Sequence, residues 1–239
     1  MEASDQTPPI QHILVIMAHP DDAEFCSGGV IKQHTDKGGT ATYVVLTGGD
    51  KGNHDLGVTV SQVVEKRMEE QRRAAAVLGV KDVIFMGEED GFLQPTRELR
   101  KRLVRIIRQL KPDVIICQNP EAYFRGDNYI NHPDHRNAGM ATIEAVFPAA
   151  GNPMFFPDLL AEGLMPHSIR ELWLCMVDQP NHKVDITAEI DVKIAALRQH
   201  VSQFDSLDEM EKWVRERWAE QGPDDSLHYY EDFKRMWFD

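Results

Sequence analysis

The chain has 239 residues, of which 42% are apolar and 27% charged, so it is long enough for one large hydrophobic core or two small ones. Its formal net charge of −13 argues against nucleic acid and against an anionic membrane surface as partners, because both are bound through clustered Lys and Arg. No apolar run approaches the ~18 residues of a membrane-spanning helix, and the first residues show no secretory signal. Cys26, Cys117 and Cys175 lack CxxC spacing, which is typical of reduced core cysteines, so we expect a cytoplasmic protein.

Short apolar, β-branched runs alternate with helical patterns along the chain. In chain order the pattern predicts strand 13–18, a helix closed by Gly38, strand 41–47, a helix from the cap Ser61 to Gly79, strand 83–86, a helix from the cap Thr96 to Pro112, strand 114–117, an irregular excursion over 147–166, strand 171–177, and helices over 188–204 and 207–219. Apolar strands separated by helices are typical of a parallel sheet that helices cover on both faces. We therefore predict an α/β fold, and the absence of a linker or composition shift favours a single domain.

Polar loops follow the first four predicted strands. They read "HPDD" (19–22), "GGDKG" (48–52), "GEEDG" (87–91) and "QNPEAYFRGDNYINHPDH" (118–135). Open parallel sheets bind ligands beyond the carboxyl ends of their strands. The chemistry of this protein is therefore expected where these loops meet.

Two histidine-bearing turns predict a metal site. His19 and Asp22 stand three residues apart across a proline turn, and "NHPDHR" adds His135 more than 100 residues later. Two imidazoles and one carboxylate leave a coordination position for water, as in hydrolytic zinc centres, so we assign these three residues as ligands of one Zn²⁺. The same set suits iron(II) oxygenases, which usually have a β-sandwich scaffold unlike this element order.

Three further residues of the same turns are candidates for the chemistry. Asp21 adjoins a ligand and is expected to act as general base, with the cation offsetting its repulsion from Asp22. His132 would either stabilise the oxyanion of the tetrahedral intermediate or protonate the leaving amine. Asp134 could accept a hydrogen bond from a nearby imidazole and fix its tautomer.

With these motifs the chain resembles the LmbE-like (PIG-L) family of zinc-dependent N-deacetylases. The matching segments are Ala18–Asp22 with Gly28–Gly29, "TGGDKG" (47–52), "RMEEQRRAAAVLG" (67–79), Asp90–Gly91, "HPDHR" (132–136) and "KIAALRQHVSQ" (193–203). The resemblance covers about residues 12–204. We therefore expect one domain over 1–239, with its core at about 12–204 and a helical, acidic C-terminal extension over about 205–239.

The resemblance implies a Rossmann-like three-layer αβα fold and removal of the acetyl group from an N-acetylated amino sugar. It supports the ligand set, Asp21 as base and His132 beside the tetrahedral intermediate, and it implies that Arg67 and Asp90 contact the sugar. Length and the 147–167 insertion are most similar to the diacetylchitobiose deacetylase branch. Members of that branch are oligomeric, so a homo-oligomer, a trimer or hexamer, is expected.

Other readings of these residues stay open in the sequence. Arg67 could form a surface salt bridge, Asp90 could be a turn residue, and His200 could support the site or pack on the core. The aromatic side chains after the fourth strand, and Trp173, could line a sugar pocket or belong to the core.

Three functions compete. The first is zinc-dependent deacetylation of an N-acetylglucosamine-containing substrate such as diacetylchitobiose, an amidohydrolase reaction of EC 3.5.1 type. The second is the same chemistry on another amide, such as a thiol conjugate or a malate glycoside of N-acetylglucosamine. The third is a metal-binding sensor or scaffold without turnover, which predicts a closed site with four protein ligands.

Overall fold

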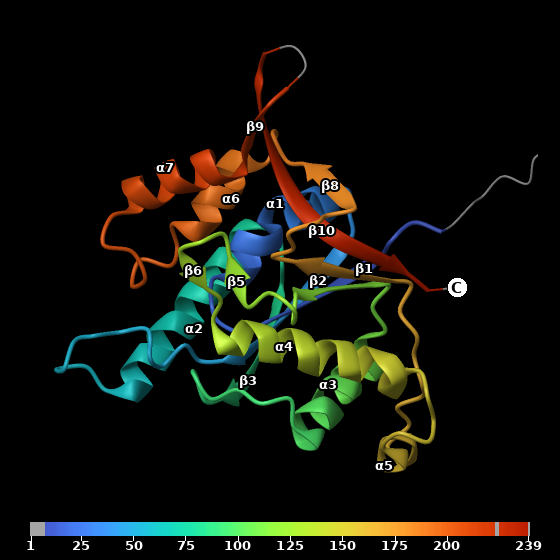
Figure 1. Ribbon diagram of the computed structural model, residues 1–239. Coiled ribbons are helices and arrows are strands. Elements are labelled where there is room, and N and C mark those ends of the chain that lie inside the picture. The colour runs from blue at the N-terminus through green and yellow to red at the C-terminus, as the bar shows by residue number, and fades with distance from the viewer. Residues whose placement is uncertain (1–7, 223–224, 239) are drawn as a thin grey trace, which may run out of the picture.

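The computed structural model describes residues 8–222 and 225–238, so residues 1–7, 223–224 and 239 of the expected domain lie outside the described residues. The expected three-layer αβα fold with a mainly parallel central sheet is confirmed (Figure 1). The strands of this sheet are β1 (His12–Met17), β2 (Thr40–Thr47), β3 (Asp82–Glu88), β4 (Val114–Gln118), β7 (Glu171–Cys175), β8 (His182–Asp185), β9 (Ala219–Gln221) and β10 (Leu227–Trp237). A separate hairpin contains β5 (Phe124–Arg125) and β6 (Tyr129–Ile130).

The sheet has the strand order β3-β2-β1-β4-β7-β10-β8, with β9 paired to β10. From β3 to β7 every neighbouring pair is parallel, whereas β10 is antiparallel to β7, β8 and β9. The carboxyl ends of the five parallel strands therefore meet at one edge of the sheet, where the polar loops were predicted to converge.

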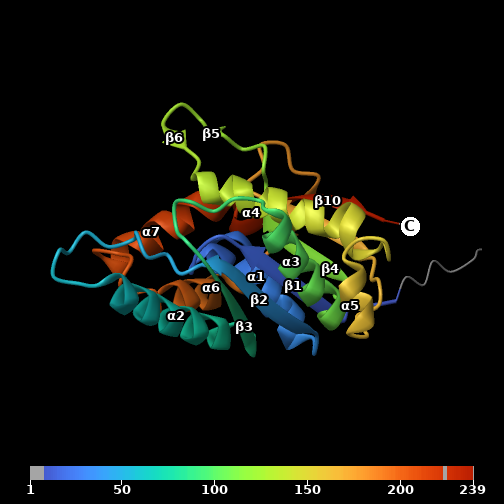
Figure 2. The same ribbon diagram turned by 90° about the horizontal axis from the view of Figure 1, so that it is seen from below.

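Helices cover both faces of the sheet (Figures 1 and 2). They are α1 (Asp22–Asp36), α2 (Val60–Val77), α3 (Arg97–Leu110), α4 (Pro133–Glu144), α5 (Pro157–Ala161), α6 (Ile190–Leu197) and α7 (Leu207–Trp218), with a π-helical segment, η1, at Ala145–Ala150. Alternate residues of β1 belong to two core clusters: Val15 to the one that contains residues of α1, α2, α6 and α7, and Leu14 to the one that contains residues of α3, α4 and α5. This alternation explains why the central strands are apolar throughout.

Helix boundaries follow mostly from local signals. Thr96 caps α3 by accepting a hydrogen bond from the Leu99 N–H at 3.1 Å, as expected. The cap of α2 is Thr59 rather than Ser61, because Thr59 and Gln62 form a reciprocal capping box. The predicted helix over 188–204 is shorter, since α6 ends at Leu197 and turns follow.

The C-terminal extension corrects our expectation. The helix predicted at 207–219 is confirmed as α7, but residues 227–237 are not helical and form β10, which enters the central sheet between β7 and β8. Tyr229, Glu231 and Phe233 point inward with the period of a strand and are buried. The central inward residue is Glu231. Because a carboxylate is rarely buried, the sequence did not indicate an alternation of buried and exposed positions here.

Glu231 is buried because a gap in α1 receives it. Ser27 has non-helical dihedral angles, and the Gly29 and Val30 N–H groups each donate to the Glu231 carboxylate at 2.9 Å. Lys193 Nζ lies 2.5 Å from Glu231 Oε1 and donates to the Phe25 carbonyl at 2.7 Å. In an unbroken helix the Gly29 N–H would donate to the Phe25 carbonyl. Here Glu231 accepts from the Gly29 N–H and Lys193 donates to the Phe25 carbonyl instead.

The Gly28–Gly29 pair lets α1 approach its neighbours closely. A Cβ atom on Gly29 would lie 2.6 Å from the Ile186 side chain, and one on Gly28 would lie 3.2 Å from Lys193 Cγ. The glycines thus follow from packing, and any larger residue at position 29 would push Ile186 or α1 away.

Arg108 ties the 147–166 excursion to α3. Its guanidinium, 1% exposed, donates to the carbonyls of Ala149, Ala150, Asn152 and Phe155. The basic sequence of α3, "RELRKRLVRIIR" (97–108), is therefore only partly a solvent-exposed helix face. Within the described residues, no helix is long and apolar enough to cross a membrane.

Candidate metal centre

His19, Asp22 and His135 come together at the carboxyl edge of the sheet. His135 Nε2 lies 3.2 Å from His19 Nδ1 and 3.2 Å from Asp22 Oδ1, while His19 Nδ1 lies 3.4 Å from Asp22 Oδ2. The three residues are 8–9% exposed, and their ligand atoms lie within 4.8 Å of one another. The two turns that the sequence separates by more than 100 residues thus form one cluster that could hold a metal ion.

Neighbouring side chains orient the two imidazoles. His135 Nδ1 lies 2.9 Å from the Asn131 amide oxygen, so that nitrogen carries the proton and Nε2 turns a lone pair toward the cluster. His19 Nε2 lies between Asp134 Oδ2 at 3.3 Å and Asp90 Oδ1 at 3.1 Å, which leaves Nδ1 as the free acceptor. Two lone pairs and a carboxylate then face one point, and only a cation makes this arrangement favourable.

The charges around the cluster also favour a bound cation. Burial opposes a positive charge on His19, but its hydrogen bonds to Asp134, Asp22 and Asp90 raise its pKa well above the usual value. A surplus of carboxylates therefore attracts positive charge to this point, which either a proton or a divalent ion can supply.

Asp22 is itself fixed by two donors. The Gln118 amide donates to its Oδ2 at 2.9 Å, and the His19 N–H donates to the same oxygen at 2.8 Å. Sequence reasoning missed Gln118, although it is a polar residue that ends the otherwise apolar strand β4.

Asp21 adopts an unusual backbone conformation beside this cluster. Its φ of 96° lies in the left-handed region, its N–H donates to the Gln71 amide oxygen at 2.8 Å, and its Oδ2 accepts from Arg67 Nη2 at 3.2 Å. Burial and the nearby Asp22 raise the pKa of Asp21, while Arg67 lowers it. The turn therefore holds Asp22 toward the two histidines and Asp21 toward Arg67.

Arg67 is buried, at 5% exposure, which excludes a surface salt bridge. It donates to the Pro20 carbonyl at 2.8 Å and to the Gly49 carbonyl at 3.0 Å. Gly49 has a φ of 64°, and a Cβ atom there would lie 2.1 Å from Arg67 Nη1. The glycines of "TGGDKG" thus admit the guanidinium that holds Asp21.

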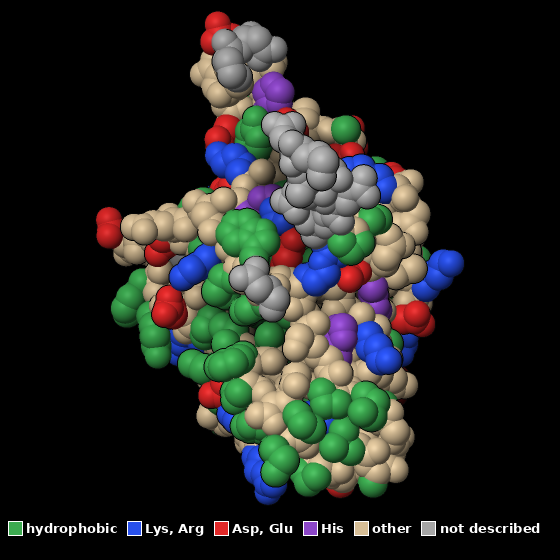
Figure 3. All heavy atoms as spheres, turned by 90° about the vertical axis from the view of Figure 1, so that its right-hand side faces the viewer, with side chains coloured by type: hydrophobic (Ala, Val, Ile, Leu, Met, Phe, Trp, Pro, Cys, Tyr) green, Lys and Arg blue, Asp and Glu red, His purple; other side chains and the backbone are tan. Residues whose placement is uncertain are grey.

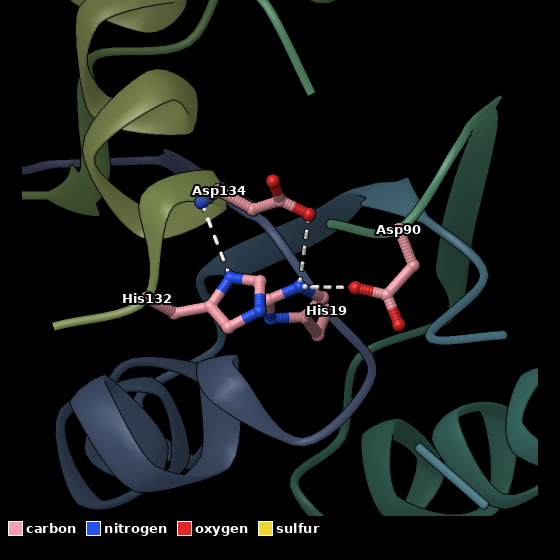
Figure 4. Close-up of side chains that lie close together, drawn as sticks. All are labelled: His19, Asp90, His132 and Asp134. Carbon is pink, nitrogen blue, oxygen red and sulfur yellow. Dashed lines mark hydrogen bonds and ion pairs between the residues drawn. The ribbon is translucent and has the colours of Figure 1, made fainter. Parts of the chain in front are cut away.

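A second group of side chains, Asp90, His132 and Asp134, lies around His19, as Figure 4 shows. His132 caps α4 and its Nδ1 accepts a hydrogen bond from the Asp134 N–H at 3.2 Å, which places the proton of the neutral ring on Nε2. Burial and the nearby His19 lower the pKa of His132. Asp134 also accepts from the Gly91 and Leu93 N–H groups at 2.7 and 3.2 Å, so it bridges His19 to the loop after β3.

Asp90 and His200, whose roles the sequence left open, both lie next to the site. Asp90 is 5% exposed, accepts from the Lys51 N–H at 2.9 Å, and has its pKa lowered by His19 and Lys51 against the effect of burial. His200 is fully buried and lies 3.4 Å from Glu24 Oε2, and Glu24 accepts from Gln71, the residue that binds the Asp21 backbone. Both residues therefore belong to the surroundings of the site.

One cavity of about 1130 Å³ opens beside the cluster. Its walls include the three clustered residues together with Asp21, Arg67, Asp90 and His132. Tyr129 also lines it, whereas Trp173 is buried in the core at 6% exposure.

Comparisons with known proteins agree with this geometry. The family described as PIG-L, GlcNAc-PI de-N-acetylase, matches residues 14–146. A diacetylchitobiose deacetylase from Thermococcus kodakarensis is 40% identical over 82% of this chain and 71% of that protein. A probable N-acetyl-alpha-D-glucosaminyl L-malate deacetylase 2 from Bacillus anthracis is 30% identical over 81% of this chain and 82% of that protein.

Solved structures give the same picture. The N,N'-diacetylchitobiose deacetylase from Pyrococcus horikoshii superposes with a TM-score of 0.87 and 32% identity, covering 98% of this chain and 87% of that one. The chain therefore belongs to the PIG-L family, and it is more similar to these diacetylchitobiose deacetylases than to the malate deacetylase.

Proposed function

We propose that the protein is a zinc-dependent N-deacetylase that hydrolyses the acetamide of an N-acetylglucosamine unit, with diacetylchitobiose as the model substrate. The observation that carries the proposal is the meeting of His19, Asp22 and His135 next to Asp21 in one cavity. The deacetylase relatives supply the reaction class, and the 40% identical relative supplies the substrate.

The three clustered residues would hold one Zn²⁺ per chain. When bound there, zinc lowers the pKa of a coordinated water and polarises the amide carbonyl. Three protein ligands would leave a position open for water, whereas a structural or sensor protein would be expected to have a closed site with four protein ligands.

Asp21 is the proposed general base. Burial raises its pKa, which makes the carboxylate a stronger base, and its hydrogen bonds to Arg67 and Gln71 fix the carboxylate and the backbone. We propose that Arg67 acts mainly by holding Asp21, because its guanidinium donates hydrogen bonds to the Asp21 turn and to the Gly49 loop. Asp90 remains the proposed sugar-contacting carboxylate.

His132 is proposed to stabilise the oxyanion of the tetrahedral intermediate. Its neutral ring directs the Nε2 proton outward, and it lines the cavity beside His19. Asp134 is then a positioning residue, because it contacts His19 and His132 through the same turn of α4.

We also propose a cytoplasmic homo-oligomer, a trimer or hexamer. The excursion exposes Phe147, Met154 and Met165 at 74, 82 and 59%, and hydrophobic side chains gather on the lower part of the face seen in Figure 3, where α5 lies. Exposed apolar patches of this kind are typical of subunit contacts. The three cysteines are free thiols, in keeping with a reducing compartment.

Acetate release from N,N'-diacetylchitobiose tests the proposed function. The full chain is expected to release acetate, to lose this activity after treatment with a chelator, and to recover it when one equivalent of Zn²⁺ is added. The malate glycoside of N-acetylglucosamine, assayed in parallel, is expected to be the poorer substrate. Acetate release that persists in metal-free protein would contradict the mechanism, and zinc-loaded protein without turnover on either compound would favour a sensor.

A further inference from the structure

The C-terminal segment forms the far wall of the cavity that contains the metal cluster. Trp213 and Trp218 of α7 and Asp232 of β10 line this cavity together with Phe25 of α1. In Figure 1, α7 lies beside α6, and α7 also contacts the sheet strand β10. Residues 207–237 lie outside the segment 14–146 that matches the family.

Trp213 presents a half-exposed aromatic surface to this cavity. Its side chain is 51% exposed, whereas Met210 and Val214 anchor α7 to the core. The Trp213 ring makes edge contacts with Phe25 and Trp218, at centroid distances of 5.8 and 5.6 Å and interplanar angles near 80°. These contacts fix the ring in one orientation without covering it.

Trp218 connects Trp213 to the buried Lys193 side chain. Lys193 Nζ lies 4.3 Å from the centroid of the Trp218 ring, and the Phe25 ring is nearly parallel to it at 6.3 Å. Because Lys193 belongs to the buried ion pair with Glu231, the aromatic cluster is anchored to the core of the domain.

Asp232 supplies a polar group on the same wall. Its Oδ1 atom is buried and makes no hydrogen bond within the described residues, and burial raises the pKa of the carboxyl group. A buried oxygen without a partner is costly, and because Oδ1 itself is enclosed, a hydroxyl group of a ligand would contact the part of the carboxyl group that lines the cavity.

The size of the cavity indicates a ligand larger than one sugar ring. Its volume of about 1130 Å³ exceeds the ~300–1000 Å³ that is usual for drug-sized ligands. One N-acetylglucosamine unit with its acetamide at the metal cluster would fill only part of this volume.

We propose that Trp213 and Asp232 form a second sugar subsite that binds the pyranose unit adjacent to the one being deacetylated. Trp213 stacks on the apolar face of that ring, and Asp232 accepts a hydrogen bond from one of its hydroxyl groups. This inference rests on the proposed function and names the part of the site that selects a disaccharide over a monosaccharide.

Steady-state kinetics on substrates of two lengths tests the subsite. Zinc-loaded wild type, Trp213→Ala, Trp213→Phe and Asp232→Asn are compared on N-acetylglucosamine and on N,N'-diacetylchitobiose. Trp213→Ala is expected to lower kcat/KM for the disaccharide about tenfold more than for the monosaccharide, the loss expected for one aromatic contact. Trp213→Phe is expected to restore most of the difference, and Asp232→Asn to lower the disaccharide preference a few-fold.

Trp237→Ala is the matched control, because Trp237 is 60% exposed on β10 and does not line the cavity. Calorimetric binding of the two amine products, glucosamine and the deacetylated disaccharide, gives the same comparison without turnover. Equal losses on both lengths, or no loss in Trp213→Ala, would overturn the subsite. Failure of the wild type to release acetate from either compound, with no binding of either amine, would instead overturn the proposed function.

Discussion

Replacing Asp21 by Asn is expected to lower kcat by about 10²–10⁴-fold, the usual contribution of a positioned general base. Asparagine keeps the size of the side chain and can still accept a hydrogen bond from Arg67, which lies 3.2 Å away. It cannot take a proton from water, so the loss should appear in kcat for N,N'-diacetylchitobiose rather than in KM.

Two measurements show whether a loss of kcat in Asp21→Asn comes from the missing base or from a missing metal ion. The Asp21→Asn protein should still bind one Zn²⁺, because the ligand cluster consists of His19, Asp22 and His135. Asp36→Asn, a change at an exposed position of the same helix α1, should leave kcat unaltered. Full turnover in Asp21→Asn would exclude it as base, and loss of zinc would show that it is a metal ligand instead.

Replacing Glu231 by Gln is expected to lower the free energy of unfolding by about 3–5 kcal/mol, the cost of removing one partner of a buried ion pair. Lys193, at 0% exposure, would lose the carboxylate that now lies 2.5 Å from it. The Gly29 and Val30 N–H groups would also lose an anionic acceptor in the kink of α1. Chemical denaturation followed by circular dichroism measures the change.

The same substitution at an exposed pair is the control. Glu220 pairs with Lys183 at 2.6 Å, and their side chains are 49 and 41% exposed. Glu220→Gln should change the free energy of unfolding by about 0–1 kcal/mol, since exposed pairs contribute little. A loss in Glu231→Gln no larger than this would show that the buried pair is not what holds α1, α6 and β10 together.

Much of the fold could be predicted because its signals are local. Apolar β-branched runs predicted the five parallel strands, and helical spacing with the Thr96 cap and the stops at Gly38, Gly79 and Pro112 predicted α1, α2 and α3, whereas α4 was not predicted. β10 could not be predicted in this way, since its central inward residue is Glu231. Its burial depends on Lys193 and on a kink at Ser27, which are distant in sequence or invisible to a periodic pattern.

The candidate site also combines residues that could be predicted from the sequence with residues that could not. Its ligand types are compressed into two short turns, so His19, Asp22 and His135 could be chosen from spacing and residue chemistry. Gln118 and Gln71 could not be chosen, because a glutamine on a strand or helix carries no motif. Their roles arise only when the sheet brings Gln118 to Asp22 and the packing of α2 on α1 brings Gln71 to the backbone of Asp21.

Metal analysis of the freshly purified protein and of His135→Ala tests the central claim most directly, that two distant histidine turns close on a single divalent ion. Elemental analysis by mass spectrometry should find one zinc per wild-type chain and almost none in His135→Ala, with acetate release lost in parallel. Active wild-type protein that contains no divalent metal, or a His135→Ala protein that retains a full equivalent, would contradict it.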